Sequence, residues 1–540
     1  MTQLALGAAP ARPGDVPASP PAGAPPKRPR LAGVDAARGV SLLGMISLHA
    51  LYEADAAGNP TWSATVFSGR AAAAFALLAG VGIAFLTGRR PVPAGERRAV
   101  SAMIAVRALA IAVIGFLLCS IDTVLDAVIL PYYGMVFLLA IPLVFLRTWI
   151  VAVIGVLLAT VGPVVNHVLL PHLPEPVLGN PTFTRLVEDP VGMLTELSLT
   201  GFYPSPAWLA YMCAGIVIGR MNLTNVRVAA GLLAGGTVLA VWANAISVLL
   251  LHRFHGLAHI WAAQPSSGLT PEYTTELLTF GGDGNTPSST WWWLAVNKPH
   301  TSTPLDLLHA TGCAVAVLGL LLLAGHVRHR LLRPLCTALL VPLAAAGSMT
   351  LTFYSAHILF INSEFDTYSA AGGCLVQVIG AVLIALAVRG TVGRGPLELA
   401  VTALATRVRR WTASGGPARV AAVIVPSSAE PDLVLPSPAE PGPAVQGSVV
   451  QGPVVQGTVL QGSVVQGTVV PSSVEVGSVV PSSVEVGSVV PSLVGSGSAE
   501  PASARSVKPP APRRPHHWDA SRRRIAQRRT RPGTGQSSGP

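Results

Sequence analysis

The sequence has little charge. Asp, Glu, Lys and Arg make up only 11% of its 540 residues, whereas 51% of the residues are hydrophobic. Because a soluble domain carries about 25% charged residues, this composition excludes an ordinary soluble protein. The mean hydropathy of +0.55 points the same way. We therefore expect a polytopic integral membrane protein whose main partner is the lipid bilayer.

Cysteine is also scarce, and its spacing gives no sign of a metal site or a disulfide framework. The five cysteines form no CxxC pair and lie in or at the ends of apolar segments. We interpret them as small core residues. The histidines of the expected outer loops also lack metal-ligand spacing, so we predict no metal. The sequence has no nucleotide-binding fingerprint either.

Long hydrophobic runs dominate the chain up to about residue 400. We count ten apolar segments of about 18–25 residues, the length that a helix needs to cross a bilayer. These runs predict an all-α membrane domain with about ten transmembrane helices. Their approximate cores are residues 36–54, 69–87, 100–119, 125–146, 149–170, 204–220, 228–251, 305–325, 334–361 and 371–389.

Arginine is concentrated in alternate connections between these segments. The other connections are acidic or neutral, and two of them are long, 171–203 and 252–304. By the positive-inside rule the arginine-rich connections face the cytoplasm, so we expect a plasma membrane protein with both termini cytoplasmic. The arginines that set this orientation are Arg89, Arg90, Arg97, Arg98, Arg147, Arg220, Arg227, Arg328, Arg330, Arg333, Arg389 and Arg394.

Both ends of the chain differ in composition from the middle. Residues 1–30 are Pro/Ala-rich and expected to be disordered, residues 31–398 form the membrane domain, and residues 399–540 are expected to be a disordered tail. The tail contains Val/Gln/Gly/Ser repeats at 445–495 and a basic end at 505–531. On a cytoplasmic tail, this basic end suits anionic lipid head groups. We expect no specific nucleic acid partner, because no nucleic-acid-binding fold accompanies the charge.

The segment from residue 30 to residue 53 carries the most informative polar residues. Arg38 and His49 lie eleven positions apart. At about 100° per residue, this separation places both on one face of a helix, within about 20° of each other. They stand about 16 Å apart along the axis, roughly half the hydrocarbon thickness. Because ionisable residues inside a bilayer are costly and indicate function, the pair predicts a path across the membrane.

Two pairs of residues in this segment have predicted roles. His49 is the residue best suited to proton transfer near neutral pH, and Glu53, four positions later, is placed to orient its imidazole. We predict that both are catalytic. Arg38 suits phosphate binding because its planar guanidinium pairs with oxyanions, and we predict that Arg38 and the neighbouring Asp35 both belong to the cofactor-binding site. The structural alternatives are a histidine at the membrane interface and an Arg38–Asp35 pair that anchors the inner end.

Five further polar residues lie in or at the ends of apolar segments. Arg107, some eight residues into the third segment, is placed to meet the phosphates of a cytoplasmic cofactor. Arg70 breaks the orientation pattern at the outer start of the second segment and is a candidate for substrate contact. Asp306 and His309 share a helix face, and His357 lies near the outer end of the ninth segment. These last three are candidate substrate-binding residues and partners of His49; the alternative for each is a satisfied interfacial group.

The first segment also carries a family motif. Asp35-Ala36-Ala37-Arg38-Gly39 through His49 resembles the Arg-x10-His first-helix motif of the membrane acyltransferase superfamily. Within that superfamily the sequence looks most like the YeiB-like and heparan-α-glucosaminide N-acetyltransferase-like bacterial membrane proteins. Three further stretches support this resemblance: Phe67-Ser68-Gly69-Arg70, Gly347-Ser348-Met349-Thr350-Leu351-Thr352-Phe353-Tyr354 and Gly395-Pro396-Leu397-Glu398.

The resemblance covers roughly residues 30–400 and implies a ten-helix membrane fold. It implies transfer of an acetyl or similar acyl group from cytoplasmic acetyl-CoA or another acyl-CoA to an extracytoplasmic acceptor, such as a cell-envelope glycan or a small molecule. Arg38 and His49 match the motif residue by residue. Nothing in the chain matches the lumenal-loop histidine of the eukaryotic heparan enzyme, so the resemblance does not extend to a glucosamine acceptor.

As an acyltransferase, the protein would use His49 as a general base or as a transient acyl carrier. Arg38 and Arg107 would hold the phosphates of the donor. Arg70 would position the acceptor or stabilise the oxyanion.

As a proton-coupled transporter, the protein would instead use His49, Glu53 and Asp306 as a proton relay. Pro131–Gly134, which interrupts the fourth segment, would then be a gating break. The sequence shows no second copy of the Asp35–His49 pattern, although many transporters have internal symmetry between their halves.

Overall fold

The computed structural model describes residues 31–122, 124–125, 127–174, 176–177, 179–391 and 393–413. In these ranges the regular elements are all helices, and strand pairing is limited to an isolated bridge between Ala54 and Pro60. The expected all-α class is confirmed. The expectations for residues 1–30, for the repeats and for the basic end concern residues outside these ranges.

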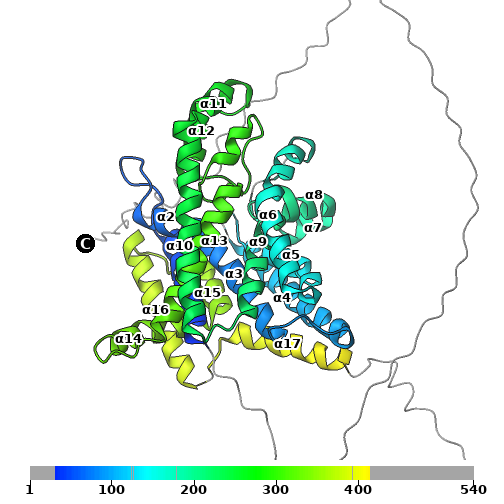
Figure 1. Cartoon of the computed structure of the whole chain (residues 1–540), viewed down its shortest axis with the longest axis vertical. Coiled ribbons are helices and arrows are strands. Elements are labelled where there is room, and N and C mark those ends of the chain that lie inside the picture. The colour runs from blue at the N-terminus through cyan, green and yellow to red at the C-terminus, as the bar shows by residue number, and fades with distance from the viewer. Residues whose placement is uncertain are drawn as a thin grey trace, which may run out of the picture. The chain divides into compact units, whose positions relative to one another are not determined.

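Seventeen α-helices make up the described chain (Figure 1). They are α1 (Ala32–Ala50), α2 (Trp62–Phe67), α3 (Arg70–Leu86), α4 (Arg97–Ile121), α5 (Leu130–Leu139), α6 (Thr148–Leu169), α7 (Phe183–Glu188), α8 (Pro190–Thr195), α9 (Ser205–Arg220), α10 (Val226–Val248), α11 (Gly256–Ala263), α12 (Pro271–Phe280), α13 (Pro304–Ala324), α14 (Leu332–Gly347), α15 (Thr350–Ile361), α16 (Ala370–Thr391) and α17 (Pro396–Ala413). The short 3-10 and π elements are η1 (Ala94–Glu96), η2 (Pro142–Phe145), η3 (Leu170–His172), η4 (Glu196–Thr200), η5 (Leu249–Arg253), η6 (Gln264–Ser266) and η7 (Trp291–Ala295).

Six helical segments of the described chain are long and apolar enough to cross a membrane, and the bent pair α14–α15 raises the number to seven if it forms one broken span. The protein is therefore a multi-pass membrane protein, but the expected total of ten spans is not confirmed. α9, with 16 residues, is shorter than these segments. The six are Trp62–Leu86, Ala94–Ile121, Thr148–His172, Val226–Arg253, Pro304–Ala324 and Ala370–Thr391.

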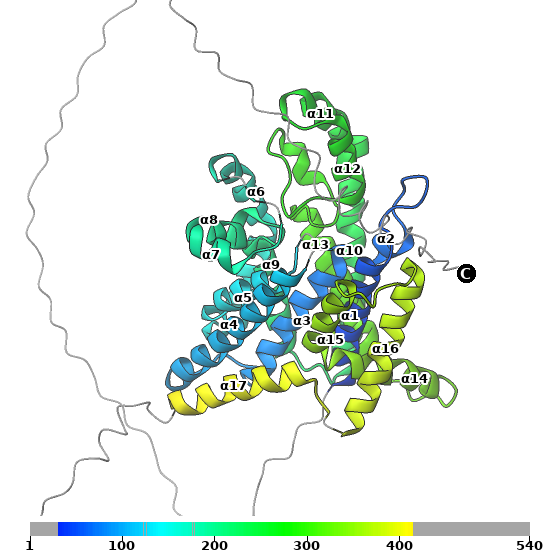
Figure 2. The same ribbon diagram turned by 180° about the vertical axis from the view of Figure 1, so that it is seen from behind.

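Helix α1 is the element around which the others pack. It contacts α3, α13, α14, α15 and α16, so protein surrounds much of its length (Figure 2). Gly39 and Gly347 make the crossing of α1 and α14 close, because a Cβ at either position would overlap the backbone of the other helix. Small residues at such contacts are typical of membrane helix pairs. Because protein surrounds it, α1 can carry Asp35, Arg38 and His49 away from lipid.

Two helix boundaries differ from the sequence prediction. The first helix was expected to continue to residue 54, but α1 ends at Ala50 and Leu51 is extended. The fourth segment was expected to be interrupted at Pro131–Gly134, but α5 begins at Leu130 and Pro131 lies in its first turn. Proline is tolerated there because the first turn has no internal hydrogen-bond partner for its backbone nitrogen. The gating break expected for a transporter is therefore absent at this place.

The chain does break within the expected ninth segment. α14 ends at Gly347, α15 starts at Thr350, and the two helix axes differ by 74°. Irregular backbone at membrane depth is tolerated where it is buried in protein or lines a cavity. The break at Ser348 and Met349 places the start of α15 beside α17.

The membrane domain also extends beyond its expected boundary at residue 398. Helix α17 begins at Pro396 and continues to Ala413, and Val401 and Ala405 are buried in its contact with α4. The sequence prediction missed this helix because α17 is too polar to resemble a transmembrane segment. Residues 399–413, which were expected to belong to the disordered tail, are therefore helical.

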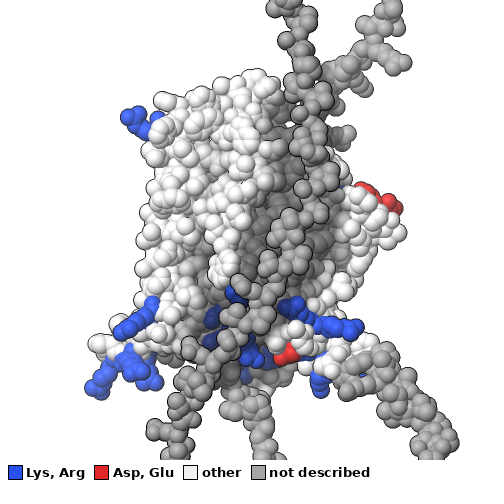
Figure 3. Space-filling model, turned by 45° about the vertical axis from the view of Figure 1, so that its right-hand side comes forward, with Lys and Arg blue, Asp and Glu red and all other residues white. Residues whose placement is uncertain are grey.

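Arginine and lysine gather at one end of the described domain. Figure 3 shows most of the visible basic side chains at the end where α17 lies in Figure 1. We call this the arginine-rich end. Its exposed residues include Arg90, Arg97, Arg98, Arg328, Arg330, Arg333, Arg407 and Arg410.

Candidate active site

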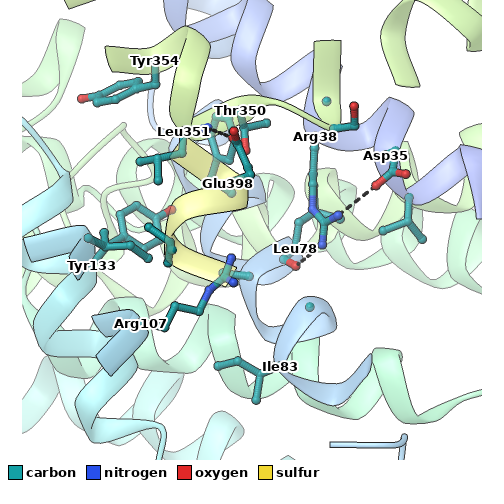
Figure 4. A pocket seen from close by; sticks show the side chains of 18 of the residues that line it. Asp35, Arg38, Leu78, Ile83, Arg107, Tyr133, Thr350, Leu351, Tyr354 and Glu398 are labelled. Atoms are coloured by element: carbon teal, nitrogen blue, oxygen red, sulfur yellow. Dashed lines mark hydrogen bonds and ion pairs between the residues drawn. The ribbon is translucent and has the colours of Figure 1, made fainter. Parts of the chain in front are cut away.

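A cavity of about 540 Å³ lies beside α1 and is lined by residues of α1, α3, α4, α5, α15 and α17. Its polar part contains Asp35, Arg38, Arg107 and Glu398 (Figure 4). Further along α1 the lining becomes apolar and aromatic, with Met45, Ile129, Tyr133, Phe137 and Tyr354. The cavity therefore joins a charged region to an apolar one.

Arg38 lies in the charged region and is only partly engaged by its neighbours. Its guanidinium donates to Asp35 Oδ1 at 2.9 Å and to the carbonyl of Leu78 at 3.4 Å. The expected pairing of Arg38 with Asp35 is present, with 25% and 15% of the two side chains exposed. Gly82 gives the guanidinium room, since a Cβ there would lie 3.2 Å from Arg38 Nη2. A guanidinium has five N–H donors, so Arg38 keeps donors for a ligand.

Arg107 and Glu398 enter the same region from α4 and α17. Within the described residues, Arg107 has no hydrogen-bond or ion-pair partner, and Figure 4 shows its guanidinium beside the cavity. Glu398 accepts hydrogen bonds from the backbone N–H groups of Leu351 and Thr352 and from the Thr352 hydroxyl. The Glu398 carboxylate is therefore occupied by hydrogen bonds at the start of α15. The Arg107 guanidinium keeps its N–H donors for a ligand.

Arg89 reaches the cavity from the end of α3. Its backbone has the left-handed φ of 62°, and its guanidinium lies 4.5 Å from the centre of the Phe85 ring. Non-glycine residues held in this conformation are strained and cluster at functional sites. The full set of charged lining residues is Asp35, Arg38, Arg89, Arg107, Arg394 and Glu398, so the lining has an excess of positive charge. Such a cavity attracts anions.

His49 and His357 meet beyond the apolar part of the cavity. His49 Nδ1 lies 2.9 Å from His357 Nε2, and the ring centroids are 5.1 Å apart with 15° between the planes. The other ring nitrogen of His357, Nδ1, contacts Oε1 of Gln377 on α16. His357 is buried, whereas His49 is partly exposed. Residues from α1, α15 and α16 thus form one hydrogen-bonded chain.

The histidine pair and the cavity are linked through two helices. Met45 lines the cavity four residues before His49 on α1, and Tyr354 lines it three residues before His357 on α15. Three or four residues correspond to one helical turn, about 5–6 Å. Both imidazoles therefore lie about one turn beyond the apolar part of the cavity. Arg38 lies at the other end of the same face of α1.

Residues 30–252 match the family model of the heparan-alpha-glucosaminide N-acetyltransferase catalytic domain. This part of the chain is similar to that catalytic domain. A comparison with curated proteins gave no match. The matched range includes the motif residues Arg38 and His49, together with Arg70 and Arg107, and ends before α13.

The other candidate residues have hydrogen-bond partners of their own and do not join the histidine pair. Arg70 Nε donates to His309 Nε2 at 3.2 Å, and its Nη1 donates to the carbonyl of Thr65. His309 Nδ1 faces the carbonyl of Ala240 and must therefore carry the proton. Both nitrogens of His309 are thus engaged. His357 is the predicted partner that contacts His49 in the structure, whereas His309 contacts Arg70 and Ala240.

Asp306 lies in the first turn of α13, near this Arg70–His309 pair. It is buried, and its carboxylate accepts from the backbone N–H of Ser302. Its own N–H donates to the capping hydroxyl of Thr303. Lys298 lies in the preceding loop, where burial and the nearby Arg70 lower its pKa. Asp306 therefore supports the start of α13.

The predicted helical relation between Glu53 and His49 is not observed. Because α1 ends at Ala50, Glu53 lies in the following loop and the spacing of four residues no longer places it on the face of His49. The Glu53 carbonyl accepts a hydrogen bond from the N–H of Thr61. The helical premise of this prediction is therefore wrong, whereas the role of Glu53 itself stays a prediction. His357 contacts the His49 ring in the structure.

Sequence reasoning missed Gln377 and gave no role to Arg89. Gln377 is the single amide side chain in the expected tenth segment, 371–389, and a polar side chain in such a run is a usable signal. The sequence indicates Arg89 only as a marker of orientation. It indicates Glu398 only as part of a family motif, because the contact of Glu398 with α15 depends on packing between distant helices. In the described residues, no group of three or more His, Cys, Asp or Glu could hold a metal ion.

Proposed function

We propose that this protein transfers an acetyl or similar acyl group across the plasma membrane, from cytoplasmic acyl-CoA to an extracytoplasmic acceptor. The observation that carries the proposal is the arrangement along α1. A cationic cavity surrounds Arg38, and a hydrogen-bonded pair of imidazoles lies at the far end of the same helix. The family match supports the reaction class. The arginine-rich end is assigned to the cytoplasm by the positive-inside rule.

The donor would bind with its phosphates in the charged part of the cavity. Arg38 and Arg107 offer guanidinium donors there, and Arg89 adds a third positive charge. Guanidinium groups suit phosphate because they contact two oxygens at once. The apolar lining near Met45, Tyr133 and Tyr354 fits the neutral, elongated arm that carries the acyl group. This placement directs the acyl end toward His49.

The hydrogen-bonded chain gives His49 the tautomer of a base. Gln377 Oε1 can only accept, so neutral His357 carries its proton on Nδ1. His357 Nε2 then accepts from His49 Nδ1–H, and His49 Nε2 retains its lone pair. This nitrogen removes the proton of the acceptor N–H or O–H as the acceptor attacks the thioester carbonyl carbon. The C–S bond breaks, and the departing sulfur receives the proton from His49.

Arg70 is the residue that we assign to the acceptor side. It starts α3 at the end of the helix away from the arginine-rich connections. His309 acts through Arg70 as a positioning residue, because its two ring nitrogens are already engaged by Ala240 and by Arg70 itself. Asp306 instead holds the start of α13 through Ser302. A cationic group held in this way can bind an oxygen-rich acceptor such as an envelope glycan or a small molecule. The acceptor would enter from this side, opposite the donor.

The test uses the full-length protein in lipid nanodiscs with acetyl-CoA as the donor. We expect the wild-type protein to bind acetyl-CoA and to release CoA when amine or hydroxyl acceptors are added. Arg38→Ala should bind acetyl-CoA more weakly, whereas His49→Ala should bind it and release little CoA. Absence of acetyl-CoA binding would overturn the proposal. Uptake of a solute into proteoliposomes driven by a proton gradient, without acyl transfer, would favour the transporter instead.

A further inference from the structure

Helix α17 lies across the arginine-rich end, whereas the apolar spans run toward the opposite end (Figures 1 and 2). It starts at Pro396, only five positions after α16 ends at Thr391. Since α16 is a candidate span, this short connection holds the start of α17 at the level where the chain leaves the bilayer. The helix is therefore positioned at a membrane surface.

One face of α17 is fixed to the domain. Val401 and Ala405 are buried, in a helix that packs on α4. Glu398, at the start of α17, caps α15. Near the other end, Arg409 forms an ion pair of 3.0 Å with Glu96. These contacts at both ends hold the helix in one orientation and decide which of its residues face outward.

The outward face combines large apolar side chains with arginine. Leu404 is 49% exposed and Trp411 is 57% exposed. Arg407, also exposed, lies between them, and spacings of three and four residues place all three on one stripe of the helix. Arg410 is exposed as well. An interfacial helix combines apolar, aromatic and basic residues in this way.

The surrounding charge indicates which surface covers this stripe. Arg97 and Arg98, in the first turn of α4, are exposed at the same end of the domain. Together with Arg407 and Arg410 they make this surface cationic. Anionic lipid head groups complement such a surface, and tryptophan prefers the head-group region.

We propose that α17 is an interfacial helix that places Leu404 and Trp411 in the head-group region and binds anionic lipid head groups through Arg407 and Arg410. This inference concerns a surface outside the donor cavity and does not depend on the acyltransferase proposal. It also does not depend on the basic segment at residues 505–531. The partner is the anionic leaflet into which the neighbouring spans insert.

The test measures tryptophan quenching in full-length protein reconstituted in nanodiscs. The nanodiscs contain phosphatidylcholine alone or an equal mixture of phosphatidylcholine and phosphatidylglycerol. In each preparation one lipid is brominated near the head-group end of its acyl chains, and the mixture is prepared once with brominated phosphatidylcholine and once with brominated phosphatidylglycerol. Subtracting the signal of Trp411→Phe from that of the wild-type protein isolates Trp411. We expect Trp411 to be quenched in both membranes and more strongly by brominated phosphatidylglycerol. Arg407→Gln with Arg410→Gln should abolish the preference for phosphatidylglycerol.

The matched control replaces Arg328 and Arg330 by Gln. These residues are exposed in the connection before α14 and carry the same total charge, so their loss should leave the quenching of Trp411 unchanged. Absence of lipid quenching of Trp411 would overturn the interfacial position. Equal quenching by the two brominated lipids, or an effect of the control as large as that of the α17 variant, would overturn specific binding of anionic head groups by Arg407 and Arg410.

Discussion

His49 Nδ1 and His357 Nε2 lie 2.9 Å apart although 308 positions separate them in the sequence. The contact joins a residue near the start of the family-matched region to a helix outside that region. Because His357 is in turn hydrogen-bonded to Gln377, three helices determine the orientation of the His49 ring. The proposed chemistry depends on this contact and on its distance from the cationic cavity.

Replacing His49 by Ala should reduce acyl transfer by about 10²–10⁴-fold, the usual effect of losing a general acid–base. Donor affinity should change little, because the charged part of the cavity lies about 16 Å away along α1. Acetyl-CoA binding and CoA release, measured on the same reconstituted protein, separate the two effects. His172→Ala, at an exposed loop position, is the control and should transfer normally. Full turnover by His49→Ala would falsify the catalytic role.

Replacing Arg38 by Ala should weaken acetyl-CoA binding about 10–100-fold, since a hydrogen bond to a charged group contributes about 1.5–3 kcal/mol. Arg38→Lys should restore only part of the affinity, because an ammonium cannot make bidentate phosphate contacts. Arg107→Met should weaken binding in the same direction. Arg90→Ala removes an exposed arginine of the same connection as Arg89 and serves as the control. Equilibrium binding measurements give the dissociation constant of acetyl-CoA for each variant. An unchanged dissociation constant for Arg38→Ala would contradict the role of Arg38 in phosphate binding.

Gln377 should act by positioning His357. Gln377→Leu offers no acceptor to the N–H of His357 Nδ1, so the His49 ring loses its preferred tautomer and kcat should fall. KM for the donor should stay near the wild-type value, because the cavity is not changed. Gln377→Glu keeps an accepting oxygen and should recover most of the lost rate. Equal loss in both variants, or a loss confined to KM, would indicate a purely structural role.

Glu398 should stabilise the domain through α15. Glu398→Ala removes three hydrogen bonds to a carboxylate, so we expect a loss of about 1.5–3 kcal/mol in the free energy of unfolding and a lower Tm in detergent. Glu96→Ala breaks the more exposed ion pair with Arg409, which contributes only about 0–1 kcal/mol. The comparison of the two melting curves tests the capping role. Equal shifts would show that the contacts of Glu398 with α15 add nothing to stability.

The orientation of the domain can be checked by cysteine labelling in intact cells. Ser288 and Gly95 are both exposed, in connections on opposite sides of the expected membrane. An impermeant thiol reagent should label Ser288→Cys in intact cells and Gly95→Cys only after the membrane is opened. The parent protein, which has five cysteines, gives the background. Labelling of Gly95→Cys in intact cells would reverse the assignment of the arginine-rich end to the cytoplasm.

The sequence by itself determined the class of the protein and the polar face of α1. Apolar composition and the length of the hydrophobic runs require a helical membrane domain, because each crossing must satisfy its own backbone hydrogen bonds. Arg38 and His49 were placed on one face by helical periodicity, which depends only on the local chain. The pairing of Arg38 with Asp35 follows from the same periodicity and is present in the structure.

Only the tertiary structure decided where the helices break and which residue meets His49. The sequence offered Asp306, His309 and His357 as equivalent partners, and packing selected His357 by bringing α15 against α1. The end of α1 at Ala50 removed the helical argument for Glu53, and the bend before α15 allowed Glu398 of α17 to cap it. Contacts of this kind depend on the close approach of helices that are distant in sequence. Periodicity fixes which face of each helix is polar, but the packing of the faces determines which polar groups come within hydrogen-bond distance.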